Sequence, residues 1–177
     1  MIDRLDRKYL SRDKPRMSSQ VVVSVTHRYC APAERVFDAW LTPWQASRFL
    51  FRSRAGTVMQ CELQPEVGGA FTVIERRNAA EGDESVFNVV HSGRYVEITR
   101  PRRLVFDVSV LAFSDESTRV TVEIASTTPQ TSEVVVKHEL GDSRHAFAIQ
   151  DSTRRDWTNM LALLERELFP RRIGVQL

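Results

Sequence analysis

The feature that most constrains the fold is one long stretch near the C-terminus, residues 143–169, which reads SRHAFAIQDSTRRDWTNMLALLERELF. It contains neither Gly nor Pro and is long enough for one helix of more than about six turns. Asp142 or Ser143 is suited to cap its N-terminus, and Pro170 stops it. A helix of this length needs an apolar partner surface of matching length, which the rest of the chain must supply.

Apolar side chains occupy one face of this predicted helix only in its second half. They recur at steps of three and four, at Trp157, Met160, Leu161, Leu164 and Leu168. Such a stripe is typical of a helix that packs on a sheet. In the first half the same face carries Gln150, Thr153 and Arg154. Two interpretations stay open: this half overlooks a cavity or its mouth, or it projects past the sheet into water.

The chain before this helix reads as strands interrupted by two short helices. Alternation of apolar and polar residues predicts a first strand over residues 20–29. Helical spacing after Pro32 predicts a short helix that Thr42-Pro43 ends, and a second helix follows over 44–49. About six further strands are predicted, over residues 57–64, 70–77, 85–99, 103–112, 118–126 and 132–140.

Glycines and polar residues mark the turns between these strands. Gly68 and Gly69 suit a tight hairpin because glycine adopts positive φ without strain. Residues 78–84 read as a polar hairpin tip, and residues 114–117 as a turn. Gly93, inside a long strand, predicts a bulge or bend.

The order of elements predicts an α+β fold with a helix-grip architecture. An antiparallel sheet of about six to seven strands must bury one face, and the long C-terminal helix is the only cover of matching length. The sheet is therefore expected to curve around that helix, with the two short helices closing one end. A sheet that bends away from a helix leaves space between them, and such space is usually a ligand cavity.

The length of 177 residues indicates one domain with a substantial core. Residues 1–19 are charged and broken by Pro15, so we expect a flexible N-terminal extension. The helix-grip domain is predicted over 20–170, and residues 171–177 form a C-terminal tail.

Composition argues against several classes of function. The net charge is +2 with acids and bases intermixed, so no nucleic-acid partner is expected. The sequence shows neither a membrane-spanning apolar run nor a signal-peptide core, so no membrane partner is expected either. Cys30 and Cys61 lack metal-ligand spacing and read as reduced thiols in the cytoplasm. The bases are nearly all Arg, which favours a GC-rich bacterial genome. No metal or cofactor is predicted.

Five stretches in this order resemble a known family: APAERVFDAWLTP, LQPEVGGAF, HSGRYVEITRPRRLVFD, VVVKHEL and DWTNMLALLERELF. Spanning residues 21–169, they resemble the AHSA-type family, named for its similarity to the activator of the 90-kDa heat-shock-protein ATPase, within the START-like (SRPBCC) helix-grip superfamily. The resemblance implies the helix-grip fold and, for bacterial members, binding of small apolar molecules. None of the motifs is catalytic.

The sequence departs from the family pattern in two places. Members often carry Trp-Trp-Gly-Pro after the second helix, where this chain has FLFRSR at residues 49–54. The shape of the pocket at that end therefore does not carry over. The eukaryotic co-chaperone adds a separate N-terminal domain, which residues 1–19 do not supply. A chaperone partner is thus not expected.

Polar side chains on strands predicted to line the cavity are candidates for chemistry. His138 is in phase with Val134 and Val136 and matches a histidine common at this strand end in the family; it orients a ligand or acts as an acid or base, or else is a histidine bonded to backbone. His91 faces either the cavity or the opposite surface. Glu75 reads as a charge in water, or as a buried carboxylate that needs a partner, for which Arg154 is one choice.

Aromatic and thioether side chains are expected to form both the core and the pocket wall. The predicted ligand-binding residues are Trp40, Phe49, Phe51, Met59, Phe71, Phe87, Phe106, His138, Arg154, Trp157 and Met160. No catalytic residue is assigned, because no nucleophile elbow, P-loop or dinucleotide fingerprint is present.

The first hypothesis is a protein that binds a small hydrophobic or amphipathic molecule between the sheet and the long helix. The second is an enzyme of the cyclase or dehydratase kind on the same fold, which requires two polar side chains that converge in the cavity. The third is an interaction domain like that of a co-chaperone, which predicts a filled core and a surface patch. A homodimer is left open.

Overall fold

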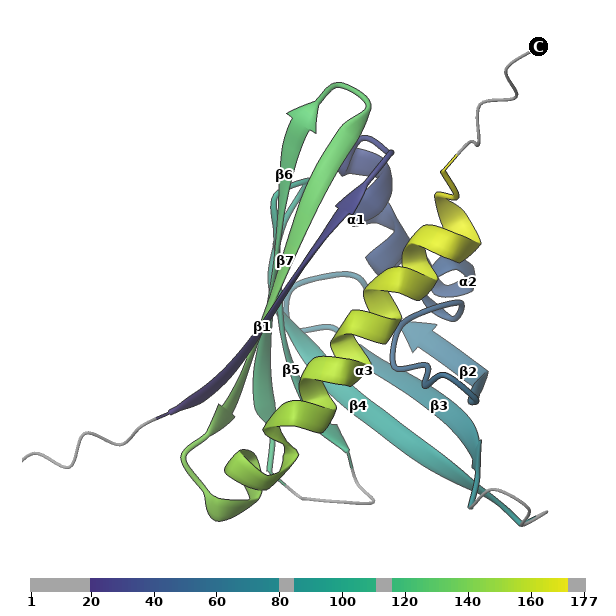
Figure 1. Cartoon of the computed structure of the whole chain (residues 1–177), viewed down its shortest axis with the longest axis vertical. Helices are drawn as coiled ribbons and strands as arrows, with labels where there is room; N and C mark the ends of the chain where they lie inside the picture. Colours follow the sequence, from purple (N-terminus) through teal and green to yellow (C-terminus); the bar gives the residue numbers. More distant parts are fainter. Residues whose placement is uncertain (1–19, 80–84, 111–115, 172–177) are drawn as a thin grey trace, which may run out of the picture.

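The computed structural model describes residues 20–79, 85–110 and 116–171, which form one seven-stranded antiparallel sheet and three helices (Figure 1). The elements in chain order are β1 (Val21–Tyr29), α1 (Ala33–Leu41), α2 (Pro43–Ala46), β2 (Thr57–Leu63), β3 (Ala70–Asn78), β4 (Val86–Thr99), β5 (Arg103–Val110), β6 (Thr118–Thr128), β7 (Thr131–Gly141) and α3 (Arg144–Leu168). The α+β helix-grip architecture predicted from the sequence is confirmed. No helix among the described residues is both long and apolar enough to cross a membrane.

The strand order across the sheet is β1-β7-β6-β5-β4-β3-β2, so the first strand lies beside the last one. Every neighbouring pair is antiparallel. The twisted sheet curves around α3, which crosses one of its faces (Figure 1). Helices α1 and α2 lie near the C-terminal half of α3. They close that end of the space between sheet and helix.

Alternation within the strands decides which side chains face α3. Val120, Val122 and Ile124 of β6 are buried, as the sequence pattern predicts. Glu123, between them, lies on the other face and forms ion pairs with Lys137 and Arg103, at 2.9 and 2.7 Å. These pairs are exposed and contribute little stability. The inner face is therefore the apolar one, and the core forms between it and α3.

Among the register shifts of the sheet, those in β2 and β4 differ from what the sequence predicts. A bulge between Val58 and Gln60 in β2 leaves Met59 half exposed to solvent, whereas Met59 was predicted to face inward. The bulge expected at Gly93 in β4 lies instead between Tyr95 and Glu97. Gly93 stays in register, and a Cβ there would overlap the Asp107 carbonyl oxygen and the Phe71 ring. Its role is therefore close approach between strands.

The helix ends follow from local chemistry. The Ser143 Oγ accepts a hydrogen bond from the Ala146 backbone N–H at 3.1 Å and caps α3, as predicted. The second short helix is shorter than predicted, because α2 ends at Ala46 and the chain continues in turns. The predicted extension over 1–19 lies outside the described residues, as do most of the hairpin tip, Ala112 and most of the tail.

Candidate functional site

A cavity of about 410 Å³ lies between the inner face of the sheet, α3 and the segment that joins α2 to β2. Aliphatic and aromatic side chains make up much of its wall, and polar groups interrupt it at separate points. The lining residues are Phe51, Arg52, Ser53, Arg77, His91, Val108, Val110, Glu116, Thr118, His138, Leu140, Ser143, His145, Ile149, Ser152, Thr153, Asp156, Trp157 and Met160.

The first half of α3 forms one side of this cavity. Ile149, Ser152, Thr153 and Asp156 line it, so the interpretation that this half overlooks a cavity fits the structure. The face is rotated from the predicted one, because Arg154 points elsewhere and donates from Nη1 to the Ser24 carbonyl oxygen at 2.9 Å. The switch from an apolar to a polar helix face thus marks where close packing gives way to open space.

His138 lines the cavity, and other side chains satisfy both of its ring nitrogens. The Trp157 Nε1–H donates to His138 Nδ1 at 3.1 Å, which makes Nδ1 an acceptor and places the proton on Nε2. His138 Nε2 then donates to the Thr118 hydroxyl at 2.8 Å, while that hydroxyl reaches the Val108 carbonyl at 3.3 Å. Burial lowers the pKa of His138 from 6.5 to about 4. This imidazole is neutral, and both of its nitrogens are hydrogen-bonded within the protein, so neither is available to a ligand.

His91 occupies the same cavity in a very different state. It projects from β4, is 7% exposed, and stacks on the Phe51 ring with centroids 4.5 Å apart and planes inclined by 5°. Neither of its ring nitrogens has a hydrogen-bond partner among the described residues. Burial, and then the positive charge of Arg77, lower its pKa from 6.5 to about 4. A buried polar group without a partner is unusual in proteins and calls for an explanation.

A charged group lies beside His91 on the inner face of β3. Glu75 is 0% exposed and accepts hydrogen bonds from the Ser53 backbone N–H and from Arg77 Nε, both at 2.6 Å. Of the two interpretations of Glu75, the buried carboxylate agrees with the structure and the solvated charge does not, and the partner is Arg77 instead of Arg154. A Cβ on Gly56 would overlap the Glu75 carboxylate, so a larger residue there would displace the carboxylate from its present position. The buried acid thus ties the 47–56 segment to the sheet.

Asp156 lines the cavity from the α3 side, on the same part of the wall as Arg77. Partial desolvation by the cavity wall raises its pKa, and the nearby Glu75 charge acts in the same direction. Arg77 and Arg155 act in the opposite direction. Arg77 is therefore ion-paired with Glu75, and its charge also favours the ionised form of Asp156.

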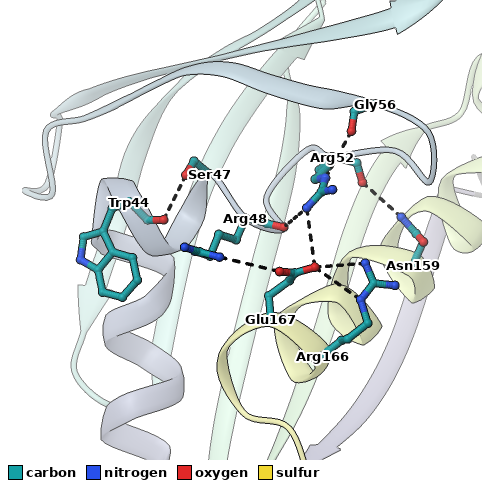
Figure 2. A network of polar contacts seen from close by, with 8 residues as sticks. All are labelled: Trp44, Ser47, Arg48, Arg52, Gly56, Asn159, Arg166 and Glu167. Atoms are coloured by element: carbon teal, nitrogen blue, oxygen red, sulfur yellow. Dashed lines mark hydrogen bonds and ion pairs between the residues drawn. The ribbon is translucent and has the colours of Figure 1, made fainter.

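The segment over residues 47–56 is fixed to α3 by a polar network (Figure 2). Arg52 donates to the carbonyl oxygens of Arg48 and Gly56, at 3.1 and 3.2 Å, and Asn159 donates to the Arg52 carbonyl at 3.1 Å. Glu167 lies 3.8 Å from Arg48 and 3.9 Å from Arg52. This network holds the backbone that carries Phe51, the residue that covers His91.

Phe51 itself has an uncommon backbone conformation. Its φ is +54°, in the left-handed region that non-glycine residues seldom occupy, at a cost of about 1–3 kcal/mol. Its N–H donates to the Met160 Sδ at 3.0 Å. The surrounding contacts therefore hold the Phe51 ring against His91 despite the local strain.

The predicted ligand-binding residues separate into three groups. Phe51, His138, Trp157 and Met160 line the cavity. Trp40, Phe49, Phe71 and Phe106 are buried in the core, where Trp40 stacks on Trp157 with centroids 6.2 Å apart. Met59, Phe87 and Arg154 are exposed and do not line the cavity. Phe87 pairs across the strands with Arg77, so it lies on the inner face at the exposed end of the β3–β4 hairpin.

Several lining residues were not predicted from the sequence. Arg77 is in phase with Phe71 and Val73 on β3, so the alternation of the strand was sufficient to predict that it faces inward. Asp156 precedes Met160 by one helical turn, so helical spacing pointed to it as well. Arg52 and Ser53 belong to an irregular segment, for which sequence periodicity gives no orientation.

The chemistry available in the cavity is recognition more than covalent reaction. The described residues offer no group of three or more His, Cys, Asp or Glu side chains that could hold a metal ion. His138 has no free nitrogen, and His91 has no polar side chain within hydrogen-bond distance among the residues described. A mainly apolar chamber whose wall contains a buried imidazole without a partner in the described part of the chain suits a molecule that is mostly apolar and carries a polar group.

Comparison with known proteins places the fold in context. A family model described as Activator of Hsp90 ATPase homolog 1-like protein matches residues 30–168. No curated protein matches the chain significantly.

Solved structures share the fold at low sequence identity. A protein from Chromobacterium violaceum is 20% identical, with a TM-score of 0.67 over 85% of this chain and 99% of that one. An AHSA1-like protein from Aeromonas hydrophila is 21% identical, with a TM-score of 0.63 over 87% and 99% of the two chains. A Plasmodium falciparum protein described as an HSP90 activator is also 21% identical, with a TM-score of 0.63 over 84% and 97%.

Proposed function

Because the chain belongs to the family of Activator of Hsp90 ATPase homolog 1-like proteins, and a fold alone does not determine a function, we propose a function from the chain's own cavity. The protein binds a small hydrophobic or amphipathic molecule between the sheet and α3. The observation that carries this proposal is the cavity of about 410 Å³. That volume lies within the range of about 300–1,000 Å³ typical of small-molecule sites.

The composition of the wall supports an apolar body for the ligand. Val108, Val110, Leu140, Ile149 and Trp157 line the cavity with aliphatic and aromatic surface. Burying apolar surface in such a site contributes about 25 cal/mol for each Å² removed from water. Polar groups along α3, such as Ser152 and Thr153, face the same space and suit a ligand that carries some polar atoms.

Two other functions receive less support from the geometry. An enzyme needs polar side chains that converge on one reacting atom, whereas His138 is already bonded on both nitrogens. An interaction domain would not need a cavity of this size. A cytoplasmic location, and the expectation of neither a nucleic-acid nor a membrane partner, stay predictions.

Native mass spectrometry of the purified protein tests the proposal first. A copurified small molecule, or an apolar compound that raises the melting temperature in proportion to the logarithm of its concentration, is the expected result. Thr153→Trp fills the cavity from α3 and should abolish both effects. Thr158→Trp is the matched control, since Thr158 is exposed on the same helix and does not line the cavity. Equal binding by both variants would refute the cavity as the site.

A further inference from the structure

The cavity wall contains a buried imidazole that forms no hydrogen bond with the described part of the protein. His91 is 7% exposed and lines the cavity, yet neither ring nitrogen has a partner among the described residues. Leaving a buried donor or acceptor unpaired costs about 1–3 kcal/mol. Most proteins avoid that cost, so its presence in a cavity wall points to a partner that arrives from outside the chain.

Resting on the proposed function, we propose that His91 is the specificity-determining residue of this cavity, and that it recognises a hydroxyl group on a neutral, otherwise apolar ligand. A neutral imidazole presents one N–H donor and one bare nitrogen acceptor. A hydroxyl both donates and accepts, so it satisfies whichever ring nitrogen it meets. Alcohols and phenols are the simplest ligands with this property.

The surrounding charges disfavour an anionic ligand. On the inner face β3 and β4 pair Val73 with His91, so Glu75 is the next inward residue of β3 beside that pair, and Arg77 follows one alternation further along, opposite Phe87. Arg77 Nε is already bonded to the buried Glu75 carboxylate. Asp156 adds a further acid from α3. The other lining guanidinium among the described residues, that of Arg52, is bonded to the carbonyl oxygens of Arg48 and Gly56. A ligand carboxylate near His91 would therefore add a third negative charge around Arg77, and burying an unpaired charge is costly.

Access to His91 depends on Phe51. The two rings are stacked at 4.5 Å, and solvent does not reach either imidazole nitrogen. Phe51 lies outside the sheet and helices, with a strained φ of +54°. A displacement of its ring, or a turn of the imidazole, exposes a nitrogen to the cavity. Ligand binding then replaces the stacking contact with a hydrogen bond.

The test compares 2-naphthol with 2-methylnaphthalene, which has a methyl group in place of the hydroxyl, by calorimetry on the full chain. In the wild-type protein the hydroxyl should favour 2-naphthol. In His91→Leu, the dissociation constant of 2-naphthol should rise about five- to tenfold relative to that of 2-methylnaphthalene. His27→Leu should keep the wild-type ratio, because His27 lies outside the cavity and contacts Glu165. An unchanged ratio in His91→Leu, or tighter binding of 2-naphthoate than of 2-naphthol, overturns the inference.

A second measurement needs no variant. In ¹⁵N-histidine NMR spectra of the wild-type protein, 2-naphthol should shift the His91 ring nitrogens and 2-methylnaphthalene should leave them in place. If both compounds bind without this difference, the role of His91 fails while the cavity proposal stands. If no probe binds and no molecule copurifies, both fail together.

Discussion

His91 and His138 face the same cavity, but only His138 is hydrogen-bonded by neighbouring side chains among the described residues. His138 is held between the Trp157 indole and the Thr118 hydroxyl, so its ring has a fixed tautomer and orientation. His91 stacks on Phe51 and forms no hydrogen bond among the described residues. A hydrogen-bonded imidazole contributes structure, whereas an unbonded one is free to recognise a ligand. The identity of a residue therefore says less about its role than the partners that surround it.

Both histidines should make stability depend on pH. Their pKa values are about 4 in the folded protein, against about 6.5 in the unfolded chain. Between these values the unfolded state binds more protons. The free energy of unfolding should therefore be highest above pH 6.5. It should fall on acidification to pH 4, by up to about 1.4 kcal/mol per pH unit for each histidine.

Urea unfolding between pH 4.5 and 7.5 measures this dependence. His91→Leu should retain the slope from His138 and lose its own share, so the curve becomes shallower. A wild-type curve that is flat from pH 7 to pH 5, or a slope identical in the variant, would contradict the buried neutral state of these rings.

The helix α3 combines two tasks along its length. Its second half packs Trp157, Leu161 and Leu164 into the core, and its first half lines the cavity with Ile149 and Ser152. The first half has fewer apolar contacts, so its stability depends more on the Ser143 cap. A weaker N-cap is therefore expected to destabilise the part of α3 that lines the cavity.

Removing the cap tests that link. Ser143→Ala should lower the free energy of unfolding by about 1 kcal/mol and increase hydrogen exchange in the first turns of α3. Ser143→Asp keeps an acceptor at the N-cap and should restore both properties, helped by the helix dipole. Faster exchange throughout α3, or none in either variant, would show that the first half is held by other contacts.

The elements themselves were largely predictable, because each has its own periodicity. The strand face of Val120, Val122 and Ile124, and the Ser143 cap, followed from spacing and capping chemistry alone. The site was less predictable. Met59 was misplaced by a bulge, and the partners of Glu75 come from the irregular 47–56 segment and from Arg77 two residues along the strand. Register and loop geometry depend on tertiary contacts, which local patterns do not encode.

The whole molecule is held together by contacts between residues far apart in sequence. Strand β1 pairs only with β7 among the described strands and packs under α3; His27 contacts Glu165, and the Tyr29 hydroxyl donates to the Leu161 carbonyl. Long-range pairing of this kind slows folding, since loop-closure entropy is lost before the contacts form. Refolding should therefore take milliseconds to seconds.

Stopped-flow fluorescence of the stacked Trp40 and Trp157 follows that reaction. Val23→Ala, at a buried position of β1, should destabilise the protein by about 1–3 kcal/mol and act mainly by speeding unfolding. That outcome means that β1 joins after the rate-limiting step. A folding rate that drops in proportion to the lost stability would instead place β1 in the folding nucleus.

The neighbouring positions of β1 and β7 also matter while the protein is being made. The strand Val21–Tyr29 leaves the ribosome early, yet its partner Thr131–Gly141 is translated about a hundred residues later. At about 5–20 residues per second, this delay is on the order of ten seconds. Throughout that time the valine-rich β1 segment has both edges unpaired and is open to association with other nascent chains. During synthesis, β1 therefore needs protection from other chains until β7 and α3 have emerged from the ribosome.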